Sequence, residues 1–129
     1  FLERPLCRPS RLAALERLID AHPGAPWTVG EMARRIGISP SRLHALSRSE
    51  WGLSPQAWLA ERRISHVRKW LAESDLPIAE LALRAGYADQ SALTRAMQRL
   101  TGLTPAAYRR QTRLGQKNRS PEQDSRPHP

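Results

Sequence analysis

The sequence is poor in the residues that support catalysis, metal binding or disulfide chemistry. Its 129 residues include a single cysteine, Cys7, and four histidines that are scattered along the chain. One cysteine excludes an internal disulfide and a cysteine-rich metal site, and it fits a reducing cytoplasm. No His-x-x-x-His, Cys-x-x-Cys or nucleophile-elbow motif occurs. The sequence therefore predicts no metal, no cofactor and no enzymatic activity.

Long apolar runs and strand-like alternation are also missing. No stretch approaches the roughly 18 consecutive apolar residues of a membrane helix, so no membrane partner is expected. Nothing alternates with a period of two, and the apolar residues instead recur at helical spacing between glycines and prolines. We therefore predict an all-α fold.

Negative charge is in the minority. Lys and Arg number 21 against 12 for Asp and Glu, which gives a net charge of +9. This surplus favours a polyanionic partner, with nucleic acid the first candidate. Nineteen of the 21 bases are Arg, and such a preference is also typical of some genome compositions. Charge alone therefore leaves the question open.

The two ends of the chain differ in composition from its middle. Residues 1–9 show no periodic apolar pattern and are interpreted as a tether, and a first residue other than Met suggests an upstream domain. From Gly115 onward there is no aliphatic residue, so a tail over residues 114–129 is predicted to be disordered. Between the ends we expect subdomains at 10–54 and 74–113, joined by a helix at 55–73.

One pattern occurs twice in this middle part. Residues 28–38 align with residues 77–87, and after one extra residue in the second copy the match continues as far as Trp58 and Tyr108. We call residues 28–58 copy one and residues 77–108 copy two. In copy one, Thr28 and Glu31 have the spacing of a capping box.

Each copy has glycine and N-cap residues at the positions expected for a helix-turn-helix. Gly37 and Gly86 can adopt the positive φ that ends a first helix, and Ser39 and Asp89 can cap a second one. A short helix, a turn with glycine and a second helix is the helix-turn-helix pattern.

The second helix of each copy, over about residues 40–51 and 90–101, is predicted to have one apolar and one polar face. Arg can bind guanine through two hydrogen bonds, Gln can bind adenine, and Ser, Thr or His can contact several base edges. A merely solvated helix face is the alternative, but two such faces in matching positions favour DNA. The predicted inward residues are Leu43, Leu46, Ser47, Leu93, Ala96 and Met97.

A single helix is predicted between the two copies. At about 1.5 Å per residue, the 19 residues from 55 to 73 span nearly 28 Å. Successive major grooves on one face of DNA lie roughly 34 Å apart. The spacing therefore permits the two recognition helices to occupy adjacent major grooves.

From about Arg11 to Arg113 the sequence resembles the DNA-binding region of the AraC/XylS family of bacterial transcription regulators. The residues that carry the resemblance are Ile78–Ala82, Gly86–Tyr87, Asp89–Ser91, Thr94–Arg95 and Gly102–Arg109, with Leu59, Arg63, Ile64 and Leu71 in the linking helix.

This resemblance implies about seven helices in two helix-turn-helix subdomains that bind double-stranded DNA in the bacterial cytoplasm. It also implies RNA polymerase as a partner at promoters, a monomeric state for this region and dimerisation through an upstream domain. By position it implies base contacts from Ser41, Arg42, His44, Ala45, Gln90, Ser91, Thr94 and Arg95. We further predict phosphate contacts from Arg48, Gln98, Arg99 and Thr104.

The sequence departs from the family pattern mainly in copy one. Ala45 cannot donate a hydrogen bond to a base, so copy two is expected to dominate specificity. Ser47 and Met97 stand where the family usually carries a core Phe, and we expect Trp51, one turn beyond Ser47, to restore the missing volume.

The main alternative is a helical protein-interaction module without DNA specificity. In that interpretation the four tryptophans would form an exposed binding surface. Two of them, Trp58 and Trp70, fall on the apolar face of the predicted linking helix, which favours a place in the core.

Overall fold

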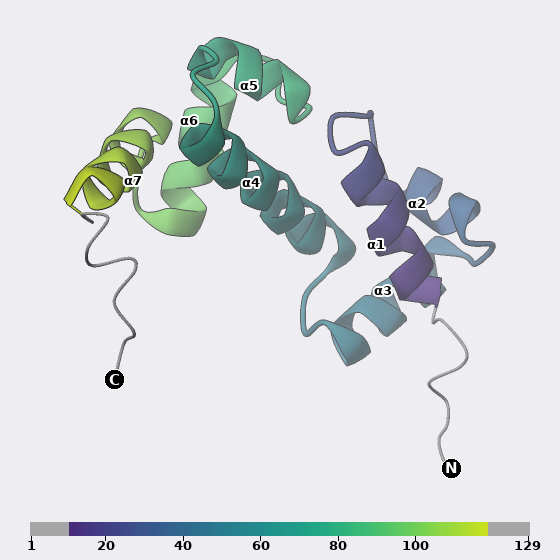
Figure 1. Ribbon diagram of the computed structural model, residues 1–129. Helices are drawn as coiled ribbons and strands as arrows, with labels where there is room; N and C mark the ends of the chain where they lie inside the picture. Colours follow the sequence, from purple (N-terminus) through teal and green to yellow (C-terminus); the bar gives the residue numbers. More distant parts are fainter. Residues whose placement is uncertain (1–10, 119–129) are drawn as a thin grey trace, which may run out of the picture. The chain divides into compact units, whose positions relative to one another are not determined.

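The computed structural model describes residues 11–118, which form helices and no strand (Figure 1). The all-α prediction, with about seven helices, is confirmed for this range. The predicted tether over residues 1–9 lies outside the described residues. The helices are α1 (Arg11–Ala21), α2 (Val29–Arg35), α3 (Pro40–Glu50), α4 (Pro55–Glu73), α5 (Ile78–Arg84), α6 (Gln90–Thr101) and α7 (Pro105–Asn118).

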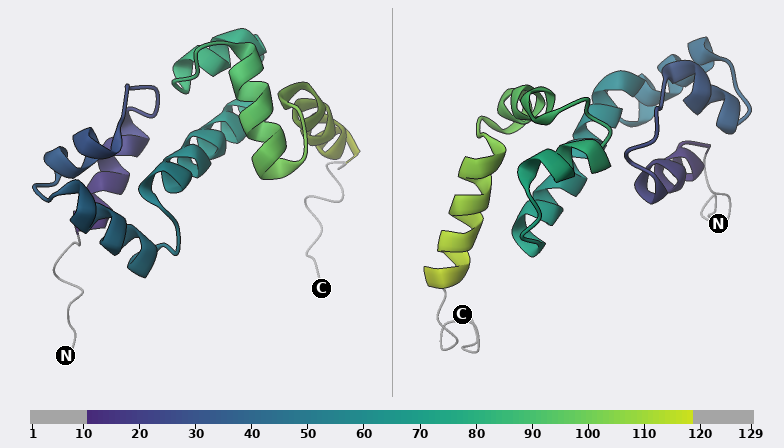
Figure 2. Two further views of the ribbon diagram at one scale, coloured as in Figure 1. Left: turned by 180° about the vertical axis from the view of Figure 1, so that it is seen from behind. Right: turned by 90° about the horizontal axis from the view of Figure 1, so that it is seen from above.

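The chain divides into two compact units, and the boundary between Arg63 and Ile64 falls inside α4. Figure 2 shows α4 as one unbroken helix. Its first turns contribute Trp58 and Leu59 to the core of the first unit, which α1, α2 and α3 complete. Its later turns contribute to the core of the second unit with α5 and α6, namely Ile64, Val67, Leu71, Leu81, Ala82, Ala85, Leu93, Ala96 and Met97.

Side-chain caps start α2, α3 and α6, whereas α5 begins after Pro77 without one. Thr28 Oγ1 accepts a hydrogen bond from the Glu31 amide, and Ser39 Oγ and Asp89 Oδ1 accept from amides in α3 and α6. Of the two bonds of a capping box, copy one has the bond from the Glu31 amide to Thr28 Oγ1 and lacks the reciprocal bond from the Thr28 amide to the Glu31 side chain. The Glu31 carboxylate binds the Arg34 guanidinium instead, at 2.6 Å.

The turn between the first two helices of each copy depends on glycine. Gly37 and Gly86 have φ values of 76° and 93°, as predicted, which a residue with a Cβ adopts only with strain. Beside the first turn, Arg11 Nη1 donates to the Ile36 carbonyl at 2.6 Å. This bond ties the start of α1 to the end of α2.

Copy one accommodates a buried serine in place of a large apolar residue. Ser47 is fully buried, and its hydroxyl donates to the His44 carbonyl at 3.3 Å, so its polar atom has a partner. Trp51 packs against the same core, as expected. Its ring stacks on Trp58 with centroids 4.0 Å apart, and its Nε1 donates to Glu16 at 3.1 Å.

The prediction of a disordered tail from residue 114 is wrong at its start. Helix α7 continues to Asn118, past Gly115. Adding one residue to an existing helix gains a hydrogen bond and orders only that residue, so propagation does not need new apolar burial. Gln116 and Lys117 also have high helix propensity. The remaining predicted tail lies outside the described residues.

Arginines bind the backbone carbonyls that lead into each helix-turn-helix. In the first unit, Arg63 donates to Pro23 O at 2.9 Å and to Ala25 O at 2.7 Å. In the second unit, Arg113 and Arg109 both donate to Ser74 O, at 2.8 Å and 2.9 Å. These carbonyls belong to the segments where α1 and α4 have ended, so no helical amide satisfies them.

We predict that Arg109→Ala destabilises the second unit. Besides Ser74 O, the Arg109 guanidinium binds Leu71 O at 3.2 Å and Leu76 O at 2.8 Å. Its loss leaves Leu71 O and Leu76 O without a charged donor, while Ser74 O keeps Arg113, so the free energy of unfolding should fall by about 2 kcal/mol. The measurement is urea denaturation followed by circular dichroism.

The neighbouring Arg110 provides a matched control, because it is exposed and makes no hydrogen bond or ion pair within residues 11–118. Arg110→Ala should change the stability by no more than about 0.5 kcal/mol. Equal losses for the two variants would contradict the role given to Arg109.

Candidate nucleic-acid interface

Helix α3 is the second helix of copy one, and α2 packs against it. Leu43 and Ser47 are buried and Leu46 is half-buried against the core, as the periodicity predicted. The opposite face carries the predicted contact residues. Ser41, Arg42, Ala45 and Arg48 are exposed, and His44 is half-buried.

Helix α6 holds the same place in copy two and packs against α5 and α7. Leu93, Ala96 and Met97 are buried, again as predicted. The outer face forms a shallow hollow with a volume of about 450 Å³. Its lining consists of the four predicted base-contact residues of this copy, Gln90, Ser91, Thr94 and Arg95.

The predicted phosphate-contact residues occupy two kinds of position. Arg48, Gln98 and Arg99 are exposed, towards the C-terminal ends of α3 and α6. Thr104 lies just before α7, where its Oγ1 accepts a hydrogen bond from the Ala107 amide at 3.1 Å. A hydroxyl that accepts in this way still has its own proton to donate.

Sequence reasoning missed the counterpart of Thr104 in copy one. Ser54 precedes α4, and its Oγ accepts from the Ala57 amide at 3.2 Å. The repeat contained the signal, because Ser54 and Thr104 each stand directly before the aligned prolines Pro55 and Pro105. Ser54 is therefore a further candidate for a phosphate contact.

The arginines of the two recognition helices differ from those that stabilise the fold. Arg63, Arg109 and Arg113 are half-buried and bind backbone carbonyls inside their own unit. The exposed arginines of the two recognition helices make no hydrogen bond or ion pair within the described range 11–118. These are Arg42, Arg48, Arg95 and Arg99.

The tryptophans do not form an exposed surface. Trp27 and Trp58 are buried, with 9% and 6% of their area exposed, and Trp51 and Trp70 are half-buried against the two cores. The exposed tryptophan surface required by a protein-interaction module is therefore absent from residues 11–118, where all four lie.

Residues 11–118 hold no cluster of three or more His, Cys, Asp or Glu side chains placed to bind a metal ion. None of the helices in this range combines the length and the apolar character needed to cross a membrane.

The sequence matches the family model described as "Helix-turn-helix domain" over residues 32–111. Among curated proteins it is 33% identical over 95 residues to the HTH-type transcriptional regulator ExsA of Pseudomonas aeruginosa. It is 31% identical over 94 residues to the arabinose operon regulatory protein of Salmonella typhimurium. These matches cover 74% and 73% of this chain but 34% and 32% of the relatives. The chain thus spans about a third of the length of the curated relatives it matches.

The fold is similar to that of solved domains of bacterial regulators. One is the DNA-binding domain of AdpA, a global transcriptional factor, in complex with a target DNA. It has a TM-score of 0.78 and 29% identity, and the match covers 84% of this chain and 97% of that one. Another is the C-terminal domain of AraT, a response regulator from Geobacillus stearothermophilus, with a TM-score of 0.74, 28% identity and coverage of 81% and 88%.

Family model, relatives and fold agree with the tandem arrangement built from α2–α3 and α5–α6. The chain belongs to the helix-turn-helix domain family and, within it, to the AraC/XylS type of bacterial transcription regulators.

Proposed function

We propose that this chain binds double-stranded DNA in a sequence-specific manner, as part of a bacterial transcription regulator. Its recognition helices are α3 and α6. The observation that carries the proposal is the state of the exposed arginines on these helices. Arg42, Arg48, Arg95 and Arg99 have no partner among the described residues and so keep all their donors available. The similar AdpA domain was solved in complex with a target DNA, which supports DNA binding as such.

Within this proposal, base contacts come from the exposed sides of the two recognition helices. In copy two, Gln90 can bind adenine and Arg95 can bind guanine, each through two hydrogen bonds, while Ser91 and Thr94 contact neighbouring edges. In copy one, Ser41, Arg42 and His44 offer hydrogen bonds, and Ala45 offers only a methyl group. Copy two therefore contributes most of the sequence preference.

Phosphate contacts fix the position of each helix along the groove. Arg48 and Arg99 provide charge, Gln98 provides amide donors, and Thr104 and Ser54 provide hydroxyl donors at the starts of α7 and α4. The amide ends of these two helices also favour an anion. Such contacts hold the protein on DNA of any sequence.

We further propose that α3 and α6 enter successive major grooves. The support is the continuous 19-residue helix α4, whose length of about 28 Å is comparable to the spacing of the grooves. RNA polymerase at promoters is the proposed protein partner, and the bacterial cytoplasm is the proposed place of action. This region is proposed to act as a monomer, with any dimerisation through another part of a longer protein.

The proposal is tested by selecting bound fragments from a pool of random duplex DNA with the 129-residue chain. We expect an asymmetric motif with two blocks whose centres lie about 10 base pairs apart. Affinity for the selected site should fall steeply with added salt, because bound phosphates release counterions. No enrichment, together with salt-insensitive indifference to DNA, would support the protein-interaction alternative.

We predict that Arg95→Ala and Arg99→Ala weaken binding in different ways. Removing a base contact should cost about 1–3 kcal/mol on the selected site and relax the preference at one or two adjacent base pairs. Removing a phosphate contact should weaken binding to every sequence alike and lower the salt slope by about 0.9. Fluorescence anisotropy on selected and scrambled duplexes separates the two. Equal losses for Arg95→Ala on both duplexes would rule out base recognition by Arg95.

We also predict that Arg42→Ala relaxes specificity less than Arg95→Ala does. Arg42 and Arg95 are both exposed on recognition helices, but Arg42 is followed on its face by Ala45, which adds no hydrogen bond. Repeating the selection with each variant gives the loss of information at each base position. A larger loss in the block read by copy one would overturn the ranking of the two copies.

A further inference from the structure

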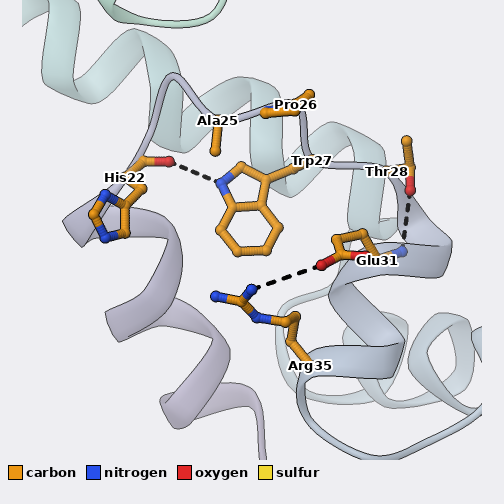
Figure 3. Close-up of a pocket in the computed structure, with 7 residues that line it drawn as sticks. All are labelled: His22, Ala25, Pro26, Trp27, Thr28, Glu31 and Arg35. Carbon is orange, nitrogen blue, oxygen red and sulfur yellow. Dashed lines mark hydrogen bonds and ion pairs between the residues drawn. The ribbon is translucent and has the colours of Figure 1, made fainter.

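The first unit contains a pocket away from the exposed face of α3. It has a volume of about 380 Å³ and lies between the end of α1, the segment that follows it and one side of α2, from Glu31 to Arg35 (Figure 3). This volume falls within the range of small-molecule sites. The lining includes His22, Ala25, Pro26, Trp27, Glu31 and Arg35.

One side of the pocket is apolar. Trp27 presents its indole ring, and Ala25 and Pro26 lie beside it (Figure 3). The one polar atom of the indole already has a partner, because Nε1 donates to the His22 carbonyl at 2.8 Å. Because only 9% of the Trp27 area is exposed, this side offers a ligand a small apolar surface, made by part of the indole ring with Ala25 and Pro26.

The other side carries charge, and the carboxylate there is already engaged. Glu31 accepts two hydrogen bonds from Arg34, at 2.6 Å and 3.2 Å. The hydrogen-bonded Arg34 guanidinium, with Arg35 as a further positive charge, holds the pKa of Glu31 below its ordinary value. Glu31 is thus ionised at neutral pH and paired with Arg34.

Arg35 is the group with unused capacity. Its Nη1 lies 3.7 Å from Glu31 Oε2, and its Cζ lies 5.4 Å from the centre of the Trp27 ring. It makes no hydrogen bond to any residue in the range 11–118. A planar guanidinium with free donors, next to an aromatic surface, can bind a carboxylate through two parallel hydrogen bonds.

We propose that this pocket binds a small planar apolar molecule with one carboxylate, its ring against Trp27, Ala25 and Pro26 and its carboxylate on Arg35. An anion is favoured over a cation because Glu31, Arg34 and Arg35 together carry one net positive charge. The site is additional to the proposed DNA-binding function, because none of the predicted DNA-contact residues lines it.

The test uses three probes and the ¹⁵N-labelled 129-residue chain. Cinnamate has the ring and the charge, cinnamamide has the ring alone, and acetate has the charge alone. We expect cinnamate to shift the Trp27 indole NH and the amides of residues 22–35, with a Kd in the low millimolar range for a ligand of this size. Cinnamamide and acetate should bind at least tenfold more weakly.

A pair of matched variants assigns the charge to one residue. Arg35→Met keeps most of the side-chain volume and should weaken cinnamate binding at least tenfold, while cinnamamide is unaffected. Arg84 is the repeat counterpart of Arg35 in copy two and binds Glu80 at 3.2 Å. Arg84→Met should leave cinnamate binding unchanged.

Three outcomes overturn the proposal. They are no saturable shifts in residues 22–35, equal binding of cinnamate and cinnamamide, and unchanged cinnamate binding in an Arg35→Met variant whose spectrum shows it to be folded. The DNA selection described above does not depend on this pocket, so the two proposals can fail independently.

Discussion

The entry of the chain into each helix-turn-helix depends on guanidinium groups that satisfy backbone carbonyls. Where α1 and α4 end, the chain must change direction before the next helix starts, and its carbonyls lose their helical partners. Arg63 supplies donors to Ala25 O in the first unit, and Arg113 supplies them to Ser74 O in the second. Ala25 and Ser74 stand at the same place in the repeat, three residues before Thr28 and Pro77. Both units thus satisfy the carbonyl at the same repeat position with an arginine side chain.

Helix α4 explains how so short a chain holds two such units. Ile64 lies 49 positions after Leu15, the same offset that separates Glu80 from Glu31, and both Ile64 and Leu15 are buried in their cores. The second half of α4 therefore has the role towards α5 that α1 has towards α2. The first half of α4 carries Trp58 and closes the first core. In the same way, α7 carries Tyr108 and packs on the second core. One helix ends one repeat and begins the next.

The helices and the faces of α3 and α6 could be predicted because their signals are local. Glycines, N-caps and apolar spacing act within a few residues of where they stand, and a single helix gathers Gln90, Ser91, Thr94 and Arg95 by periodicity alone. The arginine–carbonyl bonds could not be predicted, because Arg63 and Pro23 are 40 residues apart in sequence. The pocket beside Trp27 depends on similar long-range packing. Glu31 shows the limit of local rules. Its spacing fits both a reciprocal cap on Thr28 and an ion pair with Arg34, and the structure has the ion pair.

The separation between internally bonded and unengaged arginines has a consequence for how such a protein changes over evolutionary time. Substitutions at exposed positions without internal partners usually alter stability by less than about 0.5 kcal/mol. The outer faces of α3 and α6 can therefore drift to new side chains, and so to new targets, while the cores and the carbonyl-binding arginines stay as they are. Arginine serves both purposes. Selection for stability acts on the arginines that bind backbone carbonyls, and selection for the DNA target acts on the exposed arginines of α3 and α6.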